Sequence, residues 1–447
     1  MTATETSLPL AWDLSAVASF AGGVAFGEGT VGRVVVDSRE AGPGTLFAAL
    51  RGEHADGHDF AEEAVGRGAV ALVDSARHLK LVPRVEVDDV TNALLRLATA
   101  RRSELSCQVL AITGSTGKTS TKDLAAAALG PNSWASPRSY NNEIGVPLTI
   151  LSTPDDASVL VAEVGSRAVG DIRHLMPAVF PDVAVITNIG QVHLETFGSE
   201  AALARAKWEL VEGLSNDGVA VLPYGENRFP GVWPRTMSFG TDSEADVVVS
   251  DIEIDAEGKP SFRLSAGSET ASVRLAMAGH HQAINAAAAA AAAMALGTRL
   301  SDAAGAMEAA TGSPWRMEVH KGTYTVVNDS YNANPASTES ALRTVAAMSA
   351  APIAVLGLMA ELGEVSATEH RRIGQLAAEL GYDPVIVVGE DPGIAAGAGS
   401  VAVVAATPAE AVSAVGRAVG VGAVVLVKGS RVVGLENVAL QLEEDAR

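Results

Sequence analysis

A glycine-containing loop between an expected strand and an expected helix carries the clearest chemical signal in this chain. The apolar run 108–112 leads into the loop, and an alanine- and leucine-rich stretch, 122–129, follows it. Glycines let the backbone turn its N–H groups toward phosphate oxygens, and a helix N-terminus adds a favourable dipole. The motif Gly-x-x-Gly-Lys-Thr would direct a lysine to the β- and γ-phosphates and a hydroxyl to Mg²⁺. The predicted phosphate-binding residues are therefore Gly114, Ser115, Thr116, Gly117, Lys118, Thr119 and Ser120.

This motif is the short form of the phosphate loop, because Ile112 stands where the eight-residue pattern has its first glycine. The alternative interpretation is a chance glycine turn in front of a helix. Polar residues elsewhere favour the functional interpretation. Glu163, Asn188 and Asp329 each stand at or just after the end of an expected strand. Ligands of open parallel sheets bind at that edge, so these side chains are candidates for one common site.

Thr119 and Glu163 offer the oxygen ligands that Mg²⁺ prefers. His193 follows the next expected strand, and Lys207 lies on an expected helix. Each of these residues also has a purely structural interpretation. An acid at a strand end is often a helix cap, a single histidine is often structural, and a helical lysine is usually solvated. Only their combination suggests a catalytic centre.

Strands and helices alternate along the whole chain, which predicts an α/β protein of three domains. We expect a small α/β N-terminal domain (1–106) and a central domain (107–312) of the phosphate-loop type. The central sheet should be mostly parallel, with helices on both faces and a hairpin-like stretch at 237–277. Residues 313–447 predict a Rossmann-like, doubly wound C-terminal domain. Its first strand is not followed by Gly-x-Gly-x-x-Gly, so we do not expect a NAD site.

The composition restricts the kinds of partner. A formal net charge of −21 argues against nucleic acid and against anionic membranes, both of which select for basic surfaces. Cys107 is the only cysteine, which excludes an intramolecular disulfide and fits a reducing compartment. The first residues lack the pattern of a signal peptide, and the alanine-rich run 286–296 is too short to span a membrane. We therefore expect a cytoplasmic enzyme without membrane insertion.

Taken in order, the motifs resemble those of the Mur ligases, the ATP-dependent enzymes that form amide bonds during peptidoglycan assembly. The resemblance covers nearly the whole chain and is greatest to the members that add D-alanyl-D-alanine to a UDP-muramoyl tripeptide. It implies a ligase that forms an acyl phosphate and then an amide, releasing ADP and phosphate. The chain is expected to act as a monomer. The matching segments are 36–39, 44–47, 51–52, 56–60, 114–119, 140–149, 163–166, 187–193, 206–209, 279–285, 328–335, 356–364, 370 and 427–431.

The resemblance also implies roles for individual residues around ATP and two Mg²⁺ ions. Thr119 and Glu163 would hold one ion, and Glu163, His193 and a carbamylated Lys207 would serve the second. Carbamylation would turn a cation that repels Mg²⁺ into an oxygen-bearing anion. The implied catalytic residues are Lys118, Lys207 and His193, and the implied contacts to adenine, phosphates and ribose are Asn285, Arg316 and Asp329.

The implied substrate-binding residues lie in all three domains. They are Ser38 and Arg39 in the uridine-nucleotide segment, then Asn141, Asn142, Asn332, Lys428 and Arg431. Lys428 and Arg431 could bind the carboxylate of the dipeptide through charge-assisted hydrogen bonds. An ion pair that anchors a loop is an equally good interpretation of them.

Three positions depart from the family pattern. Gln282 replaces a usual asparagine, Leu358 stands where an aspartate is common, and Trp208 replaces a usual glycine beside Lys207. The departures at Leu358 and Trp208 leave open an amide ligase of the same superfamily with a different amine or carboxylate. A nucleotide-binding switch is the alternative from another class, but it would not need the uridine-nucleotide segment or Lys207. The sequence does not distinguish diaminopimelate from lysine as the third residue of the tripeptide.

Overall fold

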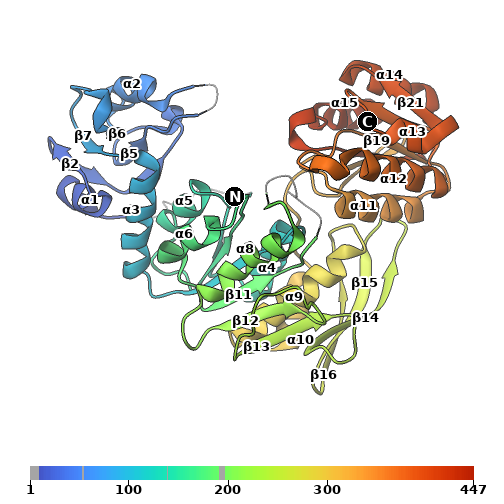
Figure 1. Cartoon of the computed structure of the whole chain (residues 1–447), viewed down its shortest axis with the longest axis horizontal. Coiled ribbons are helices and arrows are strands. Elements are labelled where there is room, and N and C mark those ends of the chain that lie inside the picture. The colour runs from blue at the N-terminus through green and yellow to red at the C-terminus, as the bar shows by residue number, and fades with distance from the viewer. Residues whose placement is uncertain (1–9, 53–54, 138, 191–196) are drawn as a thin grey trace.

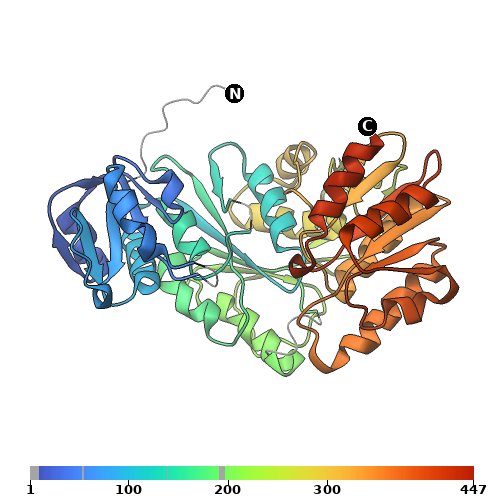
Figure 2. The same ribbon diagram turned by 90° about the horizontal axis from the view of Figure 1, so that it is seen from above.

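The computed structural model describes residues 10–52, 55–137, 139–190 and 197–447. Three larger sheets, each with its own helices, follow one another along the described chain. Figures 1 and 2 show the N- and C-terminal domains at opposite ends of the molecule, with the central domain between them. This arrangement confirms the predicted α/β class. The described helices include none with the length and apolarity that crossing a membrane requires.

The N-terminal domain contains a five-stranded sheet of order β2-β7-β6-β5-β4 and a short two-stranded pair, β1-β3. Neighbouring strands from β4 to β7 are parallel, and β2 is antiparallel to β7. Helix α3 packs against α5 and α6 of the central domain and so connects the two domains. The elements are β1 (Trp12–Asp13), α1 (Leu14–Ala21), β2 (Val24–Phe26), β3 (Thr30–Val31), β4 (Arg33–Val35), β5 (Thr45–Ala48), α2 (Ala61–Gly66), β6 (Val70–Asp74), β7 (Arg84–Val87) and α3 (Val90–Glu104).

The central domain is built on a nine-stranded sheet of order β16-β15-β14-β13-β12-β11-β8-β10-β9. Neighbouring strands from β9 to β14 are parallel, and β14, β15 and β16 form the antiparallel hairpins expected for 237–277. The elements are β8 (Gln108–Thr113), α4 (Lys118–Leu129), β9 (Ser133–Ala135), α5 (Gly145–Leu151), β10 (Val159–Glu163), α6 (Asp171–Val179), β11 (Val183–Ile186), α8 (Glu200–Glu212), β12 (Val219–Pro223), β13 (Thr236–Gly240), β14 (Val247–Ile254), β15 (Pro260–Ala266), β16 (Glu269–Arg274), α9 (His281–Ala295) and α10 (Leu300–Met307).

Both faces of the central sheet are buried, as its apolar strands predict. Along β8, Val109 and Ala111 belong to one hydrophobic cluster, and Leu110 and Ile112 belong to the other. Helix α9 packs against α4 on one face, while α6 and α8 pack together on the other. Eight consecutive alanines of α9, from Ala286 to Ala293, are at most 1% exposed, and their small side chains let neighbouring elements approach closely.

The C-terminal domain has a six-stranded sheet of order β17-β18-β22-β19-β20-β21, parallel except for β17. Separate hydrophobic clusters cover its two faces, which confirms the doubly wound prediction. The elements are β17 (Glu318–Lys321), β18 (Thr325–Asn328), α11 (Pro335–Met348), β19 (Pro352–Leu356), α12 (Ser366–Glu379), β20 (Val385–Val388), α13 (Ile394–Ala398), β21 (Ala402–Ala405), α14 (Pro408–Ala418), β22 (Val424–Lys428) and α15 (Glu436–Ala446).

Candidate active site

The predicted phosphate loop joins the end of β8 to the start of α4. Helix α4 begins at Lys118, four residues earlier than the stretch expected from the sequence. Gly114 and Gly117 have φ values of 148° and 77°, a region that residues with side chains rarely adopt. A Cβ atom on Gly114 would collide with Thr187 Oγ1, and one on Gly117 would lie 2.5 Å from Asn285 Oδ1. Glycine is therefore required at both positions by backbone conformation and by lack of space.

Lys118 bends back over this loop. Its Nζ donates a hydrogen bond to the carbonyl oxygen of Gly114 at 2.7 Å. Burial lowers the pKa of Lys118, the charge of Glu163 opposes that shift, and the charge of Arg316 adds to it. An ammonium group has three donors, and the nearby carbonyl oxygens are neutral partners. No carboxylate of the described residues pairs with Lys118 at contact distance, so its charge is available to a ligand.

Glu163 ends β10 and is 1% exposed. Its Oε2 accepts a hydrogen bond from Thr119 Oγ1 at 2.8 Å, and its Oε1 accepts one from Asn141 Nδ2 at 2.6 Å. A hydroxyl beside a carboxylate is an oxygen donor set that suits Mg²⁺, which usually takes few protein ligands beside phosphates and water. The described residues contain no cluster of three or more His, Cys, Asp or Glu side chains that could hold a metal alone. Thr119 and Glu163 therefore fit a Mg²⁺ ion whose remaining ligands come from a phosphate and water.

Lys207 lies on α8 and is 1% exposed. Its Nζ donates to Ser166 Oγ at 2.8 Å. Burial, together with the positive charge of Lys118, holds the pKa of Lys207 well below its usual value. This shift favours the neutral amine, which is the form that can react with CO₂. His193, which was expected to act with Lys207 at a second ion, lies outside the described residues.

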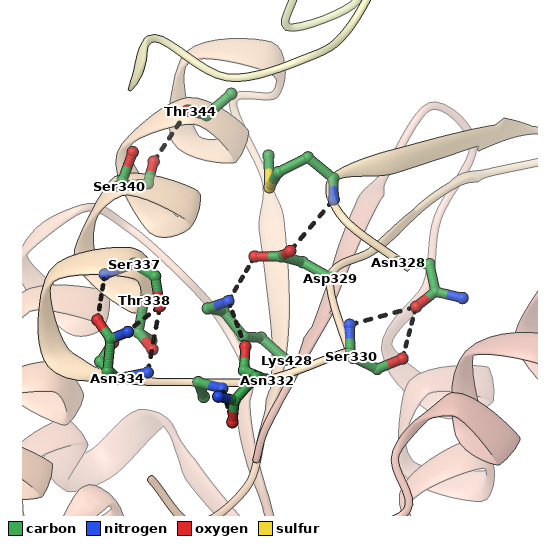
Figure 3. A network of polar contacts seen from close by, with 12 residues as sticks. Asn328, Asp329, Ser330, Asn332, Asn334, Ser337, Thr338, Ser340, Thr344 and Lys428 are labelled. Carbon is green, nitrogen blue, oxygen red and sulfur yellow. Dashed lines mark hydrogen bonds and ion pairs between the residues drawn. The ribbon is translucent and has the colours of Figure 1, made fainter. Parts of the chain in front are cut away.

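The facing wall belongs to the C-terminal domain (Figure 3). Lys428, at the end of β22, forms an ion pair of 2.5 Å with Asp329 Oδ2 and donates to the carbonyl oxygen of Asn332 at 3.0 Å. Asp329 Oδ1 accepts the backbone N–H of Met317 at 3.2 Å. Arg431 pairs with Glu436 at 3.0 Å and lies over the ring of Trp315. Both basic residues thus take part in the ion pairs that the sequence offered as an alternative to dipeptide binding.

Arg316 is a residue of the C-terminal domain that contacts the central domain. Its Nη2 donates to Ser139 Oγ at 3.0 Å, and its guanidinium lies 4.2 Å from the ring centroid of Tyr331. Its Nε is buried without a hydrogen-bond partner among the described residues. A buried donor that lacks an acceptor is costly, so an anionic ligand between the two domains would improve its environment.

A cleft of about 1430 Å³ separates the central and C-terminal domains. The structure brings most of the predicted residues to this cleft, although Gly114 and the fully buried Lys207 do not line it. The residues that do are Ser115, Thr116, Gly117, Lys118, Thr119, Ser120, Asn141, Asn142, Glu163, Asn188, Asn285, Arg316, Asp329, Asn332, Lys428 and Arg431. Ser38 and Arg39 lie elsewhere, in the N-terminal domain, where Arg39 is highly exposed and pairs with Asp37 at 2.6 Å.

Sequence reasoning missed several residues of the cleft. Tyr224, the last two residues of β13 and the following residues 241–242 line it, but no motif marks them. His281 also lines it, and its Nδ1 lies 2.9 Å from Ser340 Oγ on α11, across the boundary between the two domains. The doubled histidine in front of the alanine helix was the available signal for His281.

The three departures from the family pattern have different surroundings. Gln282 Oε1 accepts a hydrogen bond from Asn285 Nδ2 at 2.9 Å, and its Nε2 reaches Ser120 Oγ at 3.4 Å. Trp208 is buried and packs against Phe229, 5.3 Å between ring centroids. Leu358 is half-buried and is not among the residues that line the cleft. Gln282 therefore supports the loop, whereas the other two do not contact the cleft directly.

Comparisons with known proteins agree with this architecture. The profile described as Mur ligase middle domain matches residues 112–293, the Mur ligase glutamate ligase domain matches 315–431, and the Mur ligase family catalytic domain matches 30–102. The UDP-N-acetylmuramoyl-tripeptide–D-alanyl-D-alanine ligase of Mycobacterium tuberculosis is 38% identical over 403 residues, which cover 82% of this chain and 79% of that protein.

Two solved structures resemble the whole chain. The crystal structure of MurF from Acinetobacter baumannii has a TM-score of 0.88 and 30% identity, covering 98% of this chain and 100% of its own. The structure of MurF ligase from Thermotoga maritima in complex with ADP has a TM-score of 0.82 and 29% identity, covering 93% of this chain and 97% of its own. The resemblance inferred from the motifs is thereby confirmed, and the chain belongs to the Mur ligase family.

Proposed function

We propose that this protein is an ATP-dependent ligase that joins D-alanyl-D-alanine to UDP-N-acetylmuramoyl tripeptide. One observation carries the proposal beyond the similarity to relatives of that name. The phosphate loop, the carboxylate of Glu163 and the arginine of the opposite domain face the same cleft. A ligase that uses ATP to activate a carboxylate needs an anion site, a cation site and a closing wall together, and this cleft offers all three.

In the proposed reaction, ATP transfers its γ-phosphoryl group to the terminal carboxylate of the tripeptide, giving an acyl phosphate and ADP. The amine of the dipeptide then attacks the acyl carbon, the C–N bond forms, and inorganic phosphate leaves with the bonding electron pair of the broken C–O bond. The chain contributes position and charge. The loop N–H groups and Lys118 hold phosphate oxygens, and Arg316 neutralises charge from the opposite side.

Mg²⁺ is part of the proposal, because the donor set at Thr119 and Glu163 fits one ion. That ion would neutralise charge that gathers between carboxylate and phosphate. A second ion would involve Glu163, His193 and Lys207 after carbamylation. The support for this role is the buried amine of Lys207, which donates to Ser166 and whose pKa is lowered by burial.

The remaining predicted residues would bind substrates. Ser38 and Arg39 would contact the uridine nucleotide in the domain proposed for 1–106, and Asn285 would contact adenine in the domain proposed for 107–312. Asn141 and Asn142, with Asn332, Lys428 and Arg431 of the domain proposed for 313–447, would border the acceptor and dipeptide sites. In the structure, Asn141 donates to the carboxylate of Glu163, and Lys428 pairs with that of Asp329. Both residues would therefore stabilise the fold in addition to bordering a substrate. A cytoplasmic location stays a prediction.

Release of inorganic phosphate tests the function directly. Purified protein is incubated with ATP, Mg²⁺ and UDP-muramoyl tripeptide, with and without D-alanyl-D-alanine, and product masses are measured in parallel. Release that depends on both substrates, with a pentapeptide product, is the expected result. ATP binding without dipeptide-dependent release would contradict the assigned amine. It would favour a related ligase, for which the departures at Leu358 and Trp208 are the first positions to exchange.

A further inference from the structure

Ser139 lies between the two domains that form the cleft. It belongs to the loop that connects β9 to α5 in the central domain, and it is half-buried. Its Oγ is 3.2 Å from Thr119 Oγ1 and 3.0 Å from Nη2 of Arg316. One hydroxyl therefore contacts both the phosphate loop and the arginine of the C-terminal domain, which are 20 and 177 residues away in sequence.

The hydrogen bonds around Ser139 run in a single direction. Arg316 can only donate, so Ser139 Oγ accepts from it. The single proton of Thr119 is donated to Glu163 Oε2, so the proton of Ser139 is directed to Thr119 Oγ1. Hydroxyl groups that accept one bond and donate the next polarise one another, and such chains are stronger than isolated pairs. The chain Arg316–Ser139–Thr119–Glu163 thus connects a cation of one domain to a carboxylate of the other.

The backbone around Arg316 holds this arm in place. Trp315 and Met317, on either side of it, have φ values of 62° and 53°, which are unfavourable for residues with large side chains. The N–H of Trp315 donates to Glu318 Oε2 at 3.0 Å, and the N–H of Met317 donates to Asp329 Oδ1 at 3.2 Å. Carboxylates of the C-terminal domain hold both residues that flank Arg316. The direction of the Arg316 side chain therefore depends on where that domain lies.

We propose that Ser139 is a positioning residue that couples the placement of the C-terminal domain to the cation site at Thr119 and Glu163. This inference rests on the proposed function, which makes Thr119 and Glu163 the Mg²⁺ ligands. Thr119 Oγ1 accepts from Ser139 and donates to Glu163, so one lone pair stays unused and can face a cation. Arg316 reaches Thr119 only through Ser139 in these described contacts. Without the Ser139 hydroxyl, the position of Arg316 would no longer affect the positions of the Mg²⁺ ligands Thr119 and Glu163.

The test compares nucleotide binding with and without the metal. ADP is titrated into the full-length protein by calorimetry, once with Mg²⁺ and once with a chelator. Ser139→Ala should weaken binding of Mg·ADP about tenfold, the size expected for a lost hydrogen bond to a charged network. Binding of ADP alone should change by less than about twofold, because the loop N–H groups and Lys118 remain. Ser139→Thr keeps the hydroxyl and should restore the affinity for Mg·ADP.

A matched control and a double variant separate coupling from a general loss of structure. Ser152→Ala removes a half-buried hydroxyl that donates only to Thr149 O at the end of α5, and it should bind both forms of ADP normally. In the Ser139→Ala/Arg316→Ala pair, the losses for Mg·ADP should be clearly less than multiplicative. Multiplicative losses, or an equal loss with and without Mg²⁺, would overturn the coupling while the proposed function stands. A wild-type protein that binds no nucleotide would overturn both.

Discussion

The charged residues on the two walls of the cleft have different kinds of partner. On the central wall, neutral groups hold the charged side chains: Lys118 contacts the carbonyl oxygen of Gly114, and Glu163 accepts from Thr119 and Asn141. On the C-terminal wall, Asp329 pairs with Lys428 and Arg431 pairs with Glu436. A charge held by dipoles remains available to a ligand, whereas a charge paired at contact distance is mostly committed to the fold.

Arg316 is the exception that makes this comparison useful. It belongs to the C-terminal domain, yet the described structure records no ion pair for it. Its partners are the hydroxyl of Ser139 and the ring of Tyr331, which are neutral like the partners on the central wall. The distinction is therefore between charged residues with neutral partners, which are available to a ligand, and charged residues in ion pairs, which stabilise the domain. Variants on the two walls should accordingly lose different properties.

Lys118→Ala should have the largest effect and should separate chemistry from stability. Loss of the ammonium group removes the donor that we propose for the phosphates, and ATP turnover should fall about 10³-fold. The fold should persist, because Glu163 keeps its hydrogen bonds from Thr119 and Asn141. Phosphate release and thermal unfolding measure the two properties. The exposed Lys80 supplies the control variant Lys80→Ala, and near-normal turnover in Lys118→Ala would remove the ATP-site assignment.

Lys207→Ala should have the next largest effect on activity, and it tests whether Lys207 acts as a carbamate. Activity should fall about 100-fold, the usual loss when a group that organises metal ligands is removed. A small carboxylate such as acetate should restore part of it, since the vacated volume beside Ser166 can accept an anion in place of the carbamate. Steady-state rates with increasing acetate measure this effect. Acetate should not rescue Lys118→Ala, and full activity of Lys207→Ala without any additive would refute the role.

The sequence could predict features that depend on neighbouring residues in the chain. The phosphate loop is one, because strand, glycine turn and helix N-terminus follow each other within a few residues. Alternating apolar strands and helices were enough for the α/β class, since burial on both faces requires continuous apolar strands. The start of α4 was placed too late because the polar residues 118–121 form its first turn, where helix propensity is a weak guide.

Features that depend on the order of strands in the sheet could not be predicted. Lys428 and Asp329 meet because β22 pairs directly with β18, an arrangement that brings together residues 99 positions apart. Nothing in the sequence identifies these two strands as neighbours, so an ion pair and a dipeptide site remained equally good interpretations. The left-handed conformations of Trp315 and Met317 could not be predicted either, because neither is a residue type that favours positive φ. In the structure, their N–H groups donate to Glu318, three residues further on, and to Asp329.

Lys428→Met should mainly reduce stability, in contrast to the two central lysines. The substitution leaves Asp329, largely buried, without its cation, and the free energy of unfolding should fall by about 3 kcal/mol. Adding Asp329→Asn should recover part of this loss, because the unpaired charge is then removed. Urea unfolding of the single and double variants measures both effects. Unchanged stability with a raised KM for D-alanyl-D-alanine would instead assign Lys428 to the dipeptide and break the comparison between the walls.

The smallest expected effect concerns His281, which lies where the two walls meet, and the pH dependence of stability. Burial lowers its pKa from 6.5 to about 4; the charge of Asp329 opposes this shift, while those of Lys428 and His280 add to it. The unfolded chain binds the proton more tightly than the folded one, so the free energy of unfolding falls as pH falls from about 6.5 toward 4 and is level above that range.

Between pH 7 and pH 5, this histidine alone should cost about 2 kcal/mol of stability. His281→Asn keeps a polar side chain for Ser340 but cannot take up the proton, so its urea-unfolding curves should depend less on pH than those of the wild type. His78→Asn, at an exposed position with φ 50° that asparagine tolerates, is the matched control and should keep the wild-type pH dependence. Identical pH dependence in His281→Asn and the wild type would mean that the folded protein binds the His281 proton as tightly as the unfolded chain does. His281 would then carry a charge in the folded protein below about pH 6.5, and the comparison between the two walls would have to include that charge among those available to a ligand.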